Sequence, residues 1–503
     1  MTQPIFEKFT AGIKRAVFTD TAKIDCKTGV STESVKKVLS VLASPTITDY
    51  SAVKDNLKYT AKVCFFVVYI DGDGVVRKTE CANTVEGAIA INGLEEGEKI
   101  RLSSKVEKAQ PDLNGLNLNL NAVLSVTAVK RDKVVINTLT GGEGLYYCEE
   151  ERRVEKDFGE RDGEYRIEEE FEIDGEVQEV LSHGAKVAIS ATQCGVGSVI
   201  VDGQIFLTVI ALQKSQRCSI IKETRTLPFR MEIEHPDAMP TMSAFAFATE
   251  RSVKTEVLVD QETGKSTVKA SLSIGFTGCA YSTDTVSFAT DAFSVEKHIA
   301  LEKSVSEYYL RKEMRTVTEP QVLRASVENL PIGTTVLAVG AENLEIIEVQ
   351  ANGCGATLTG EYSCTAYLSD AEGELITMRL SAPIEKKFEN LFADGDGVAE
   401  CKAVVEKGVA RIVSATEMEV ETQIILTVYP EERAQASFVS DLSVTGDKER
   451  NPHAIRVYIP EEGEELWSLA KRLNTCPQAL VETNPELTFP LTGKERIVVY
   501  RQK

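Results

Sequence analysis

Short apolar segments recur in this chain at a nearly constant interval, and this periodicity limits the possible folds more than any other feature. One set of similar Val-rich segments repeats every 149 residues, at Val38, Val187 and Val336. A second set repeats every 150 residues, at Leu124, Ile274 and Ile424. A fixed period of self-similarity indicates repeated structural units. The sequence therefore predicts three copies of one module, with boundaries near residues 150, 300 and 440.

Within each predicted module, apolar and polar residues alternate along short segments. Residues 116–128 show this clearly, with Leu, Ala or Val at every even position. A period of two is typical of a β-strand with one buried face. Asp-Gly-Asp-Gly segments at 71–74 and 394–397 are interpreted as hairpin turns. The pattern predicts a mainly β chain with three repeated antiparallel β-sandwich-like modules, at residues 1–150, 151–300 and 301–440.

Two kinds of segment depart from this simple alternation. Residues 5–18 place four apolar side chains roughly on one face of a helix, namely Phe6, Phe9, Ile13 and Val17. They predict an N-terminal amphipathic helix that docks on a membrane or on the first module, and its low basic charge favours the first module. The charged segments 164–173 and 307–317 lie near module joints, and we expect solvated edge strands or bridging strands there, because charge discourages unwanted edge pairing.

The C-terminal end has a different pattern. Residues 441–452 are polar, contain Gly and Pro, and are predicted to form a linker. In residues 453–503 a strand-like segment is followed by two short helical segments and a second strand. Leu466, Leu469, Ala470 and Leu473 fall on one face of the first helix. A small β-α-α-β domain is therefore expected at residues 453–503.

This domain resembles the LysM family. The resemblance rests on Val457, Gly463, Leu466, Trp467, Leu469, Ala470, Leu480, Asn484, Pro485, Leu491, Gly493, Ile497 and Val499. LysM domains bind glycans that contain N-acetylglucosamine, in a shallow groove between two loops. The resemblance implies that the groove here is lined by Gly463, Glu464, Glu465, Leu466, Trp467, Asn484, Pro485, Glu486 and Leu487.

Two positions in this groove leave the type of ligand open. The family usually has Asp-Thr after the conserved Gly, whereas this chain has Glu464 and Glu465. The added charge leaves room for a protein ligand in place of a glycan. Trp467, the only Trp in the chain, is either an anchor for a partner or a packing residue of the small core.

Three β modules followed by one LysM domain resemble the clostridial family of spore-coat morphogenetic proteins, which carry SPOCS domains. The resemblance covers nearly the whole chain. It implies a non-enzymatic scaffold or adaptor of spore envelope assembly, in the mother-cell cytoplasm at the forespore surface. Its LysM domain would bind a coat basement-layer protein, an ATPase, and/or a peptidoglycan-type glycan. The resemblance leaves self-association open.

Charge and targeting signals agree with this expectation. The chain carries 56 Lys and Arg against 77 Asp and Glu, a formal charge of −21, which disfavours nucleic acid and anionic membranes as partners. We find no signal peptide at the N-terminus and no apolar stretch long enough for a transmembrane segment. The 11 scattered Cys include no C-x-x-C pair and indicate reduced thiols in the cytoplasm.

The sequence shows no catalytic or metal-binding motif, so we expect no enzymatic activity, no cofactor and no metal. The four His are isolated, at positions 183, 235, 298 and 453. The alternative function is an exported peptidoglycan-binding cell-wall protein, or a wall hydrolase targeted by its LysM domain. A hydrolase would need a nucleophile with a base, or a metal centre, formed by residues distant in sequence.

Overall fold

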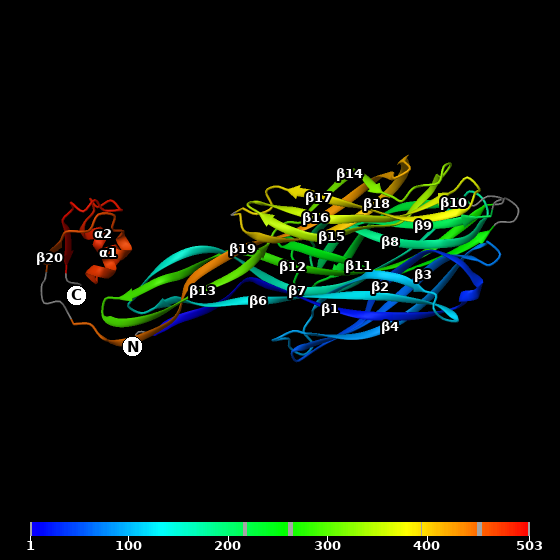
Figure 1. Ribbon diagram of the computed structural model, residues 1–503. Coiled ribbons are helices and arrows are strands. Elements are labelled where there is room, and N and C mark those ends of the chain that lie inside the picture. The colour runs from blue at the N-terminus through cyan, green and yellow to red at the C-terminus, as the bar shows by residue number, and fades with distance from the viewer. Residues whose placement is uncertain (1–2, 215–218, 260–264, 394, 450–454, 501–503) are drawn as a thin grey trace.

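The computed structural model describes residues 3–214, 219–259, 265–393, 395–449 and 455–500. Antiparallel β-strands dominate these residues, and the α-helices are two short segments near the C-terminus. The predicted mainly β fold class is therefore confirmed. Figure 1 shows an elongated molecule with most of the strands gathered at one end and the helical segments at the other. No helix within the described ranges is long and apolar enough to span a membrane.

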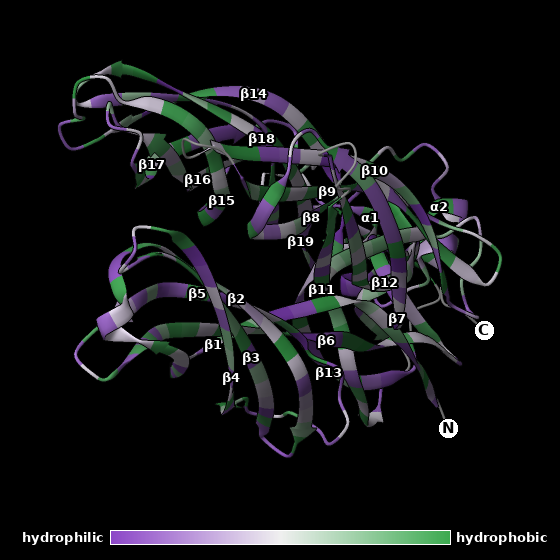
Figure 2. Ribbon diagram, turned by 90° about the vertical axis from the view of Figure 1, so that its right-hand side faces the viewer, coloured by the Kyte–Doolittle hydropathy of each residue, from purple (hydrophilic) through white to green (hydrophobic). Residues whose placement is uncertain are grey.

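The first module is a sandwich of two antiparallel layers. One layer is a three-stranded sheet of β2 (Val35–Val53), β3 (Asn56–Asp71) and β4 (Val76–Ala90). The other belongs to a seven-stranded sheet and consists of β1 (Pro4–Ser31), β6 (Asn117–Gly142) and β5 (Arg101–Asp112). Alternate residues of both layers, such as Leu57 on β3 and Leu120 on β6, are fully buried between them. The same alternation appears as green and purple segments in Figure 2.

The second and third modules repeat this arrangement. In the second, β8 (Val177–Cys194), β9 (Ser198–Gln213) and β10 (Ser219–Glu234) face β7 (Leu145–Ile173), β12 (Ser266–Ser294) and β11 (Ser243–Val259). In the third, β15 (Thr335–Asn352), β16 (Gly355–Ser369) and β17 (Leu375–Phe388) face β14 (Arg315–Ser326), β19 (Glu417–Asp447) and β18 (Gly397–Ser414). β13 (Lys297–Arg311) precedes β14 and pairs with the second half of β19.

Strand register shows that one sequence landmark marks equivalent positions. Leu124, Ile274 and Ile424 lie on β6, β12 and β19, the central strands of the three larger layers. At each of these residues the register of the neighbouring edge strand shifts, on β5, β11 and β18 respectively. The 150-residue spacing therefore reflects a register shift at the same position in three copies of the same layer.

The three Val residues of the other landmark lie on equivalent strands, but Val187 is not at the equivalent position of its strand. Val38, Val187 and Val336 lie on the equivalent strands β2, β8 and β15. Val38 and Val336 each precede a register shift, and on β8 the residue that precedes the corresponding shift is Val180. The structural counterpart of Val38 in the second module is thus Val180, seven residues before Val187. Strand bulges change the number of residues per element, so a fixed sequence offset fails here.

Three two-stranded ribbons extend beyond the modules and form a stalk, visible in Figure 1 as the long strands that lead toward the C-terminal domain. Each ribbon belongs to one module: β1 with β6, β7 with β12, and β13 with β19. An isolated two-stranded ribbon is marginally stable in water. Here the ribbons share buried cores that include Ile136, Phe288, Tyr308 and Phe438. Packing the three ribbons together therefore supplies the burial that each one lacks.

The predicted N-terminal helix is wrong. Residues 4–31 form the single strand β1, which pairs with β6 along most of its length. Phe6 and Phe9 pack against the stalk cores, and Ile13 is buried, whereas Val17 is exposed. The apolar spacing suited one face of a helix, but β6 satisfies the backbone of this segment through antiparallel pairing.

Strands also cross several predicted boundaries. β7 runs through residue 150 and β13 through residue 300, while β19 continues to Asp447 inside the predicted linker. Of the charged segments, 164–173 lies on β7, the edge strand of its three-stranded sheet. In 307–317, β13 bridges β19 and β1, and Tyr308, Leu310 and Arg311 are buried. This second segment is a bridging strand between modules and is not a solvated edge.

Buried ion pairs hold the modules together where the stalk begins. Arg131 of the first module contacts Glu431 of the third at 2.8 Å, and both side chains are almost fully buried. Arg311 on β13 is paired with Asp157 of the second module. A buried charge that loses its partner is strongly destabilising, so each pair favours the module arrangement that provides both charges.

Candidate ligand-binding site in the C-terminal domain

The C-terminal domain has the predicted β-α-α-β order. β20 (Ile455–Tyr458) pairs with β21 (Ile497–Tyr500), and between them lie α1 (Leu466–Leu473) and α2 (Pro477–Thr483). The helices and strands enclose a small core of Leu469, Ala470, Leu473, Leu480, Leu491, Ile497 and Val499. The predicted linker and domain also include residues 450–454 and 501–503, which lie outside the described residues.

The two loops of the predicted groove are adjacent. The Gly463 N–H donates to the Leu491 carbonyl oxygen at 2.8 Å, and the Leu491 N–H donates to the Glu464 carbonyl oxygen at 3.0 Å. These bonds connect the loop that follows β20 to the loop that precedes β21. Gly463 has a φ of +82°, a conformation that favours Gly. The backbone therefore fixes the spacing between the two sides of the groove.

Four of the predicted groove residues are exposed, namely Gly463, Glu465, Pro485 and Glu486. Leu466 and Leu487 are half-buried and pack against the core of the domain. The exposed positions offer backbone groups and two carboxylates to a ligand. This combination can accept hydrogen bonds from hydroxyl, amide or cationic groups.

Glu464 holds the loop in place. Its carboxylate accepts two hydrogen bonds from Arg472 on α1, at 2.8 and 2.7 Å, and one from the Glu461 N–H at 3.2 Å. The hydrogen bond from Arg472 is the main reason that the pKa of Glu464 is lowered. Of the two adjacent acidic residues, Glu464 is thus neutralised by Arg472 within the domain, and Glu465 is exposed.

Asn484 is buried and connects α2 to β21. Its amide nitrogen donates to the carbonyl oxygens of Leu480 at 2.9 Å and Val498 at 2.8 Å. Its amide oxygen accepts the Val498 N–H at 2.8 Å. Because these three bonds lie within the domain, the Asn484 side chain stabilises the second groove loop.

Trp467 contacts the stalk. Its indole N–H donates to Asp291 on β12 at 2.9 Å, and its ring meets the ring of Phe293 edge-on, at a centroid distance of 5.1 Å. Phe293 belongs to the same buried cluster as the core of the C-terminal domain. Of the two interpretations from sequence, Trp467 is a packing residue, but it packs across a domain boundary.

Asp291 is the centre of this joint. Besides Trp467, its carboxylate contacts the Lys471 ammonium of α1 at 2.8 and 2.6 Å and the Lys303 ammonium of β13 at 3.1 Å. Burial would raise the pKa of Asp291, but the hydrogen bonds from Lys471, Trp467 and Lys303 outweigh it and the pKa is lowered. The ionised carboxylate therefore joins the second module, the third module and the C-terminal domain.

Further polar contacts surround this centre. Lys448 donates to the Ser294 carbonyl oxygen at 2.8 Å and to the Asn474 side-chain oxygen at 2.6 Å. Asn474 in turn donates to the Val295 carbonyl oxygen at 2.9 Å. Sequence reasoning did not find these residues or Asp291. Trp467 and Asp291 are 176 residues apart, and no local pattern connects them.

The His residues and the Asp-Gly turn that the sequence analysis named have hydrogen-bond partners or near neighbours within the fold where the structure describes them. His235 is buried, with its Nε2 3.0 Å from the Gly159 carbonyl oxygen, and the His183 Nδ1 lies 3.1 Å from the Thr255 hydroxyl. His453 lies outside the described residues. Asp71 closes the hairpin turn between β3 and β4 by accepting the Asp73 and Val75 N–H groups. Among the described residues, no group of three or more His, Cys, Asp or Glu could hold a metal ion.

No protein-family model matches the sequence, and searches among curated proteins and among solved structures also give no match. The resemblances to the LysM and SPOCS families therefore stay predictions that rest on the residues named above.

Proposed function

We propose that the chain is a non-enzymatic scaffold of spore envelope assembly whose C-terminal domain binds a coat basement-layer protein and/or a glycan that contains N-acetylglucosamine. The resemblance of the sequence to the spore-coat morphogenetic family motivates this proposal. The proposal includes the location that the resemblance implies, which is the mother-cell cytoplasm at the forespore surface.

One structural observation carries the proposal. The C-terminal domain lies at the far end of the stalk and is attached to it through Trp467, Lys471 and Asn474. The groove positions Glu465 and Glu486 are exposed in this attached state. Figure 1 shows the separation between this domain and the three modules. This separation supports the proposal, because an adaptor between two layers needs a binding domain held away from its body.

The exposed groove carboxylates provide a direct test. In the full-length double variant Glu465→Arg and Glu486→Arg, we expect at least tenfold weaker binding to the purified basement-layer ATPase in a pull-down titration. The matched control is Glu482→Arg, which reverses the charge of an exposed residue on α2 without altering the groove loops. Equal binding by both variants, or no binding by the unmodified chain, would count against the adaptor function.

The same proteins distinguish a glycan ligand from a protein ligand. Calorimetry with N-acetylglucosamine oligomers and sedimentation with purified peptidoglycan measure glycan binding directly. Binding of the oligomers that is lost in the groove variant but kept in Glu482→Arg assigns a glycan to the groove. If wall suspensions also lose turbidity in the presence of the chain, the hydrolase alternative replaces the scaffold.

A further inference from the structure

The three modules meet through the outer faces of their small sheets. The first strand of each small sheet has a register shift, and the first residue after this shift pairs with an equivalent residue of the middle strand. These equivalent residues are Val68, Ile210 and Tyr367. All three belong to one buried cluster, together with Leu39 and Leu181. This junction therefore lies where three copies of the same surface face one another.

Two residues further along the first strand, the three copies differ. The equivalent residues there are Leu42 on β2, Gly184 on β8 and Gly340 on β15. A Cβ atom on Gly340 would overlap Ile210, so that glycine allows close packing. A Cβ atom on Gly184 would meet no atom within 4 Å. The missing side chain at Gly184 thus leaves a space that close packing does not fill.

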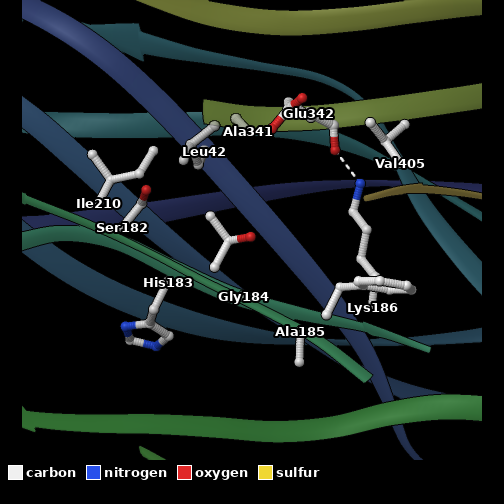
Figure 3. Close-up of a pocket in the computed structure, with 12 residues that line it drawn as sticks. Leu42, Ser182, His183, Gly184, Ala185, Lys186, Ile210, Ala341, Glu342 and Val405 are labelled. Atoms are coloured by element: carbon white, nitrogen blue, oxygen red, sulfur yellow. Dashed lines mark hydrogen bonds between the residues drawn. The ribbon is translucent and has the colours of Figure 1, made fainter. Parts of the chain in front are cut away.

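This space is a cavity of about 180 Å³ between the modules. Its walls come from all three: Leu42 from the first, Ser182 and Lys186 from the second, and Glu342 from the third. Figure 3 shows these side chains around the opening, with Gly184 between them. A cavity of about 150 Å³ is large enough for benzene. The space can therefore hold a molecule of about six to nine non-hydrogen atoms.

The walls combine apolar side chains with hydrogen-bond donors. Leu42, Ile210 and Val405 supply the apolar surface, and Ser182 and Thr208 supply hydroxyl groups. Lys186 places an ammonium group at the wall, where it donates to the Glu342 carbonyl oxygen (Figure 3). The Lys186 ammonium can only donate and the two hydroxyl groups can donate or accept, so the wall can bind a ligand that carries acceptors.

The single carboxylate of the cavity wall already has partners. The Glu342 carboxylate is paired with Lys222, and the Tyr362 hydroxyl donates to it at 3.2 Å. Glu342 and Lys222 are both largely buried. This pairing neutralises the negative charge of Glu342 locally and reduces its repulsion of an anionic ligand.

A buried hydroxyl next to the cavity also lacks an acceptor. Tyr367 is completely buried beside the Ser40 and Ser182 side chains, and Ser182 lines the cavity. Within the described part of the chain, the Tyr367 hydroxyl has no hydrogen-bond partner of acceptable geometry, and neither has the Ser40 hydroxyl. A buried hydroxyl without a partner is costly, but neither Tyr367 nor Ser40 lines the cavity itself.

We propose that this cavity binds a small organic carboxylate. The carboxylate group accepts hydrogen bonds from Lys186 and Ser182, and the apolar part lies against Leu42, Ile210 and Val405. The site is separate from the groove of the C-terminal domain. Because all three modules line it, an occupied site stabilises the assembled modules through ligand binding to the folded state.

Benzoate and propanoate are suitable probes for the full-length chain. We expect saturable binding by calorimetry and an increase in the melting temperature with ligand concentration. The neutral analogue benzyl alcohol should bind at least tenfold more weakly than benzoate. If neither carboxylate binds, or if benzyl alcohol binds as well as benzoate, the proposal is wrong and the cavity holds only water or unspecific apolar molecules.

Two variants test the location of the site. Gly184→Leu introduces the side chain that the first module has at Leu42 and should reduce benzoate affinity at least tenfold. Gly29→Leu is the matched control, because a Cβ atom there also meets no atom within 4 Å and the residue lies away from the cavity. Lys186→Met keeps the cavity and removes the ammonium, so it should weaken benzoate binding but not benzyl alcohol binding. Unchanged benzoate affinity in Gly184→Leu and in Lys186→Met would overturn the assignment.

Discussion

Replacing Asp291 with Ala should release the C-terminal domain from the stalk. Asp291 accepts a hydrogen bond from the Trp467 indole and contacts two ammonium groups, those of Lys471 and Lys303. A hydrogen bond to a charged acceptor contributes about 1.5–3 kcal/mol. Lys471 and Lys303 are 43% and 55% exposed, so their ion pairs add only about 0–1 kcal/mol each. We therefore expect Asp291→Ala to weaken docking by about 2–3 kcal/mol.

Tryptophan fluorescence measures this loss directly. Trp467 is the only Trp in the chain and lies beside Phe293 in the docked state. Release would expose the indole, shift its emission to longer wavelength and increase quenching by acrylamide. Asp284→Ala is the control, since Asp284 is an exposed residue on the same strand, β12. If Asp291→Ala and Asp284→Ala leave emission and quenching equally unchanged, the joint does not depend on Asp291.

Acid should have the same effect as this substitution. The docked state lowers the pKa of Asp291, so docking gains stability from the ionised carboxylate above its ordinary pKa of about 3.9. That contribution is lost as the pH falls through the lowered pKa of the docked state. Trp467 quenching should therefore stay constant from neutral pH down to about pH 4 and increase below it.

Three further substitutions test the packing of the modules and of the C-terminal domain. Burial lowers the pKa of Lys402 from 10.5 to about 8, so Lys402→Met should raise the free energy of unfolding at pH 7 by about 3 kcal/mol. This gain should shrink as the pH rises from about 8 toward 10.5, which denaturant titrations at several pH values would show. Gly87→Ala would place a Cβ atom against the Tyr59 ring and should destabilise the first module by about 1–3 kcal/mol in denaturant unfolding. Asn484→Ala removes three internal hydrogen bonds and should cost about 1–3 kcal/mol, measured by hydrogen exchange of the Val498 amide.

Sequence patterns were sufficient for the strands with clear alternation and for one landmark of the repeat. Alternation identifies a half-buried strand locally, and Leu124, Ile274 and Ile424 share a register because each lies on the central strand of its layer. The N-terminal segment could not be resolved in this way. Its apolar spacing fits a helix face as well as a bulged strand, and the strand that pairs with it, β6, begins more than a hundred residues later.

The candidate site could also be predicted only in part from the sequence. The two groove loops belong to one compact domain, so a local motif could place them together. The roles of Glu464 and Asn484 became clear only from their partners, Arg472 and Val498. The contact between Trp467 and Asp291 is set by tertiary packing of the stalk, and a single sequence contains no signal for it.

The stalk also determines how the protein responds to mechanical load. β19 runs without interruption for 31 residues, about 100 Å of extended chain, and leads toward the C-terminal domain. It pairs with β13 near the tip and with β14 and β18 inside the third module. A pull along its axis shears all of these hydrogen bonds at once, whereas a sideways pull would open them one after another. Tension applied at the tip of the stalk is therefore carried into the core of the third module, and we expect this ribbon to resist a pull along its axis better than a sideways pull.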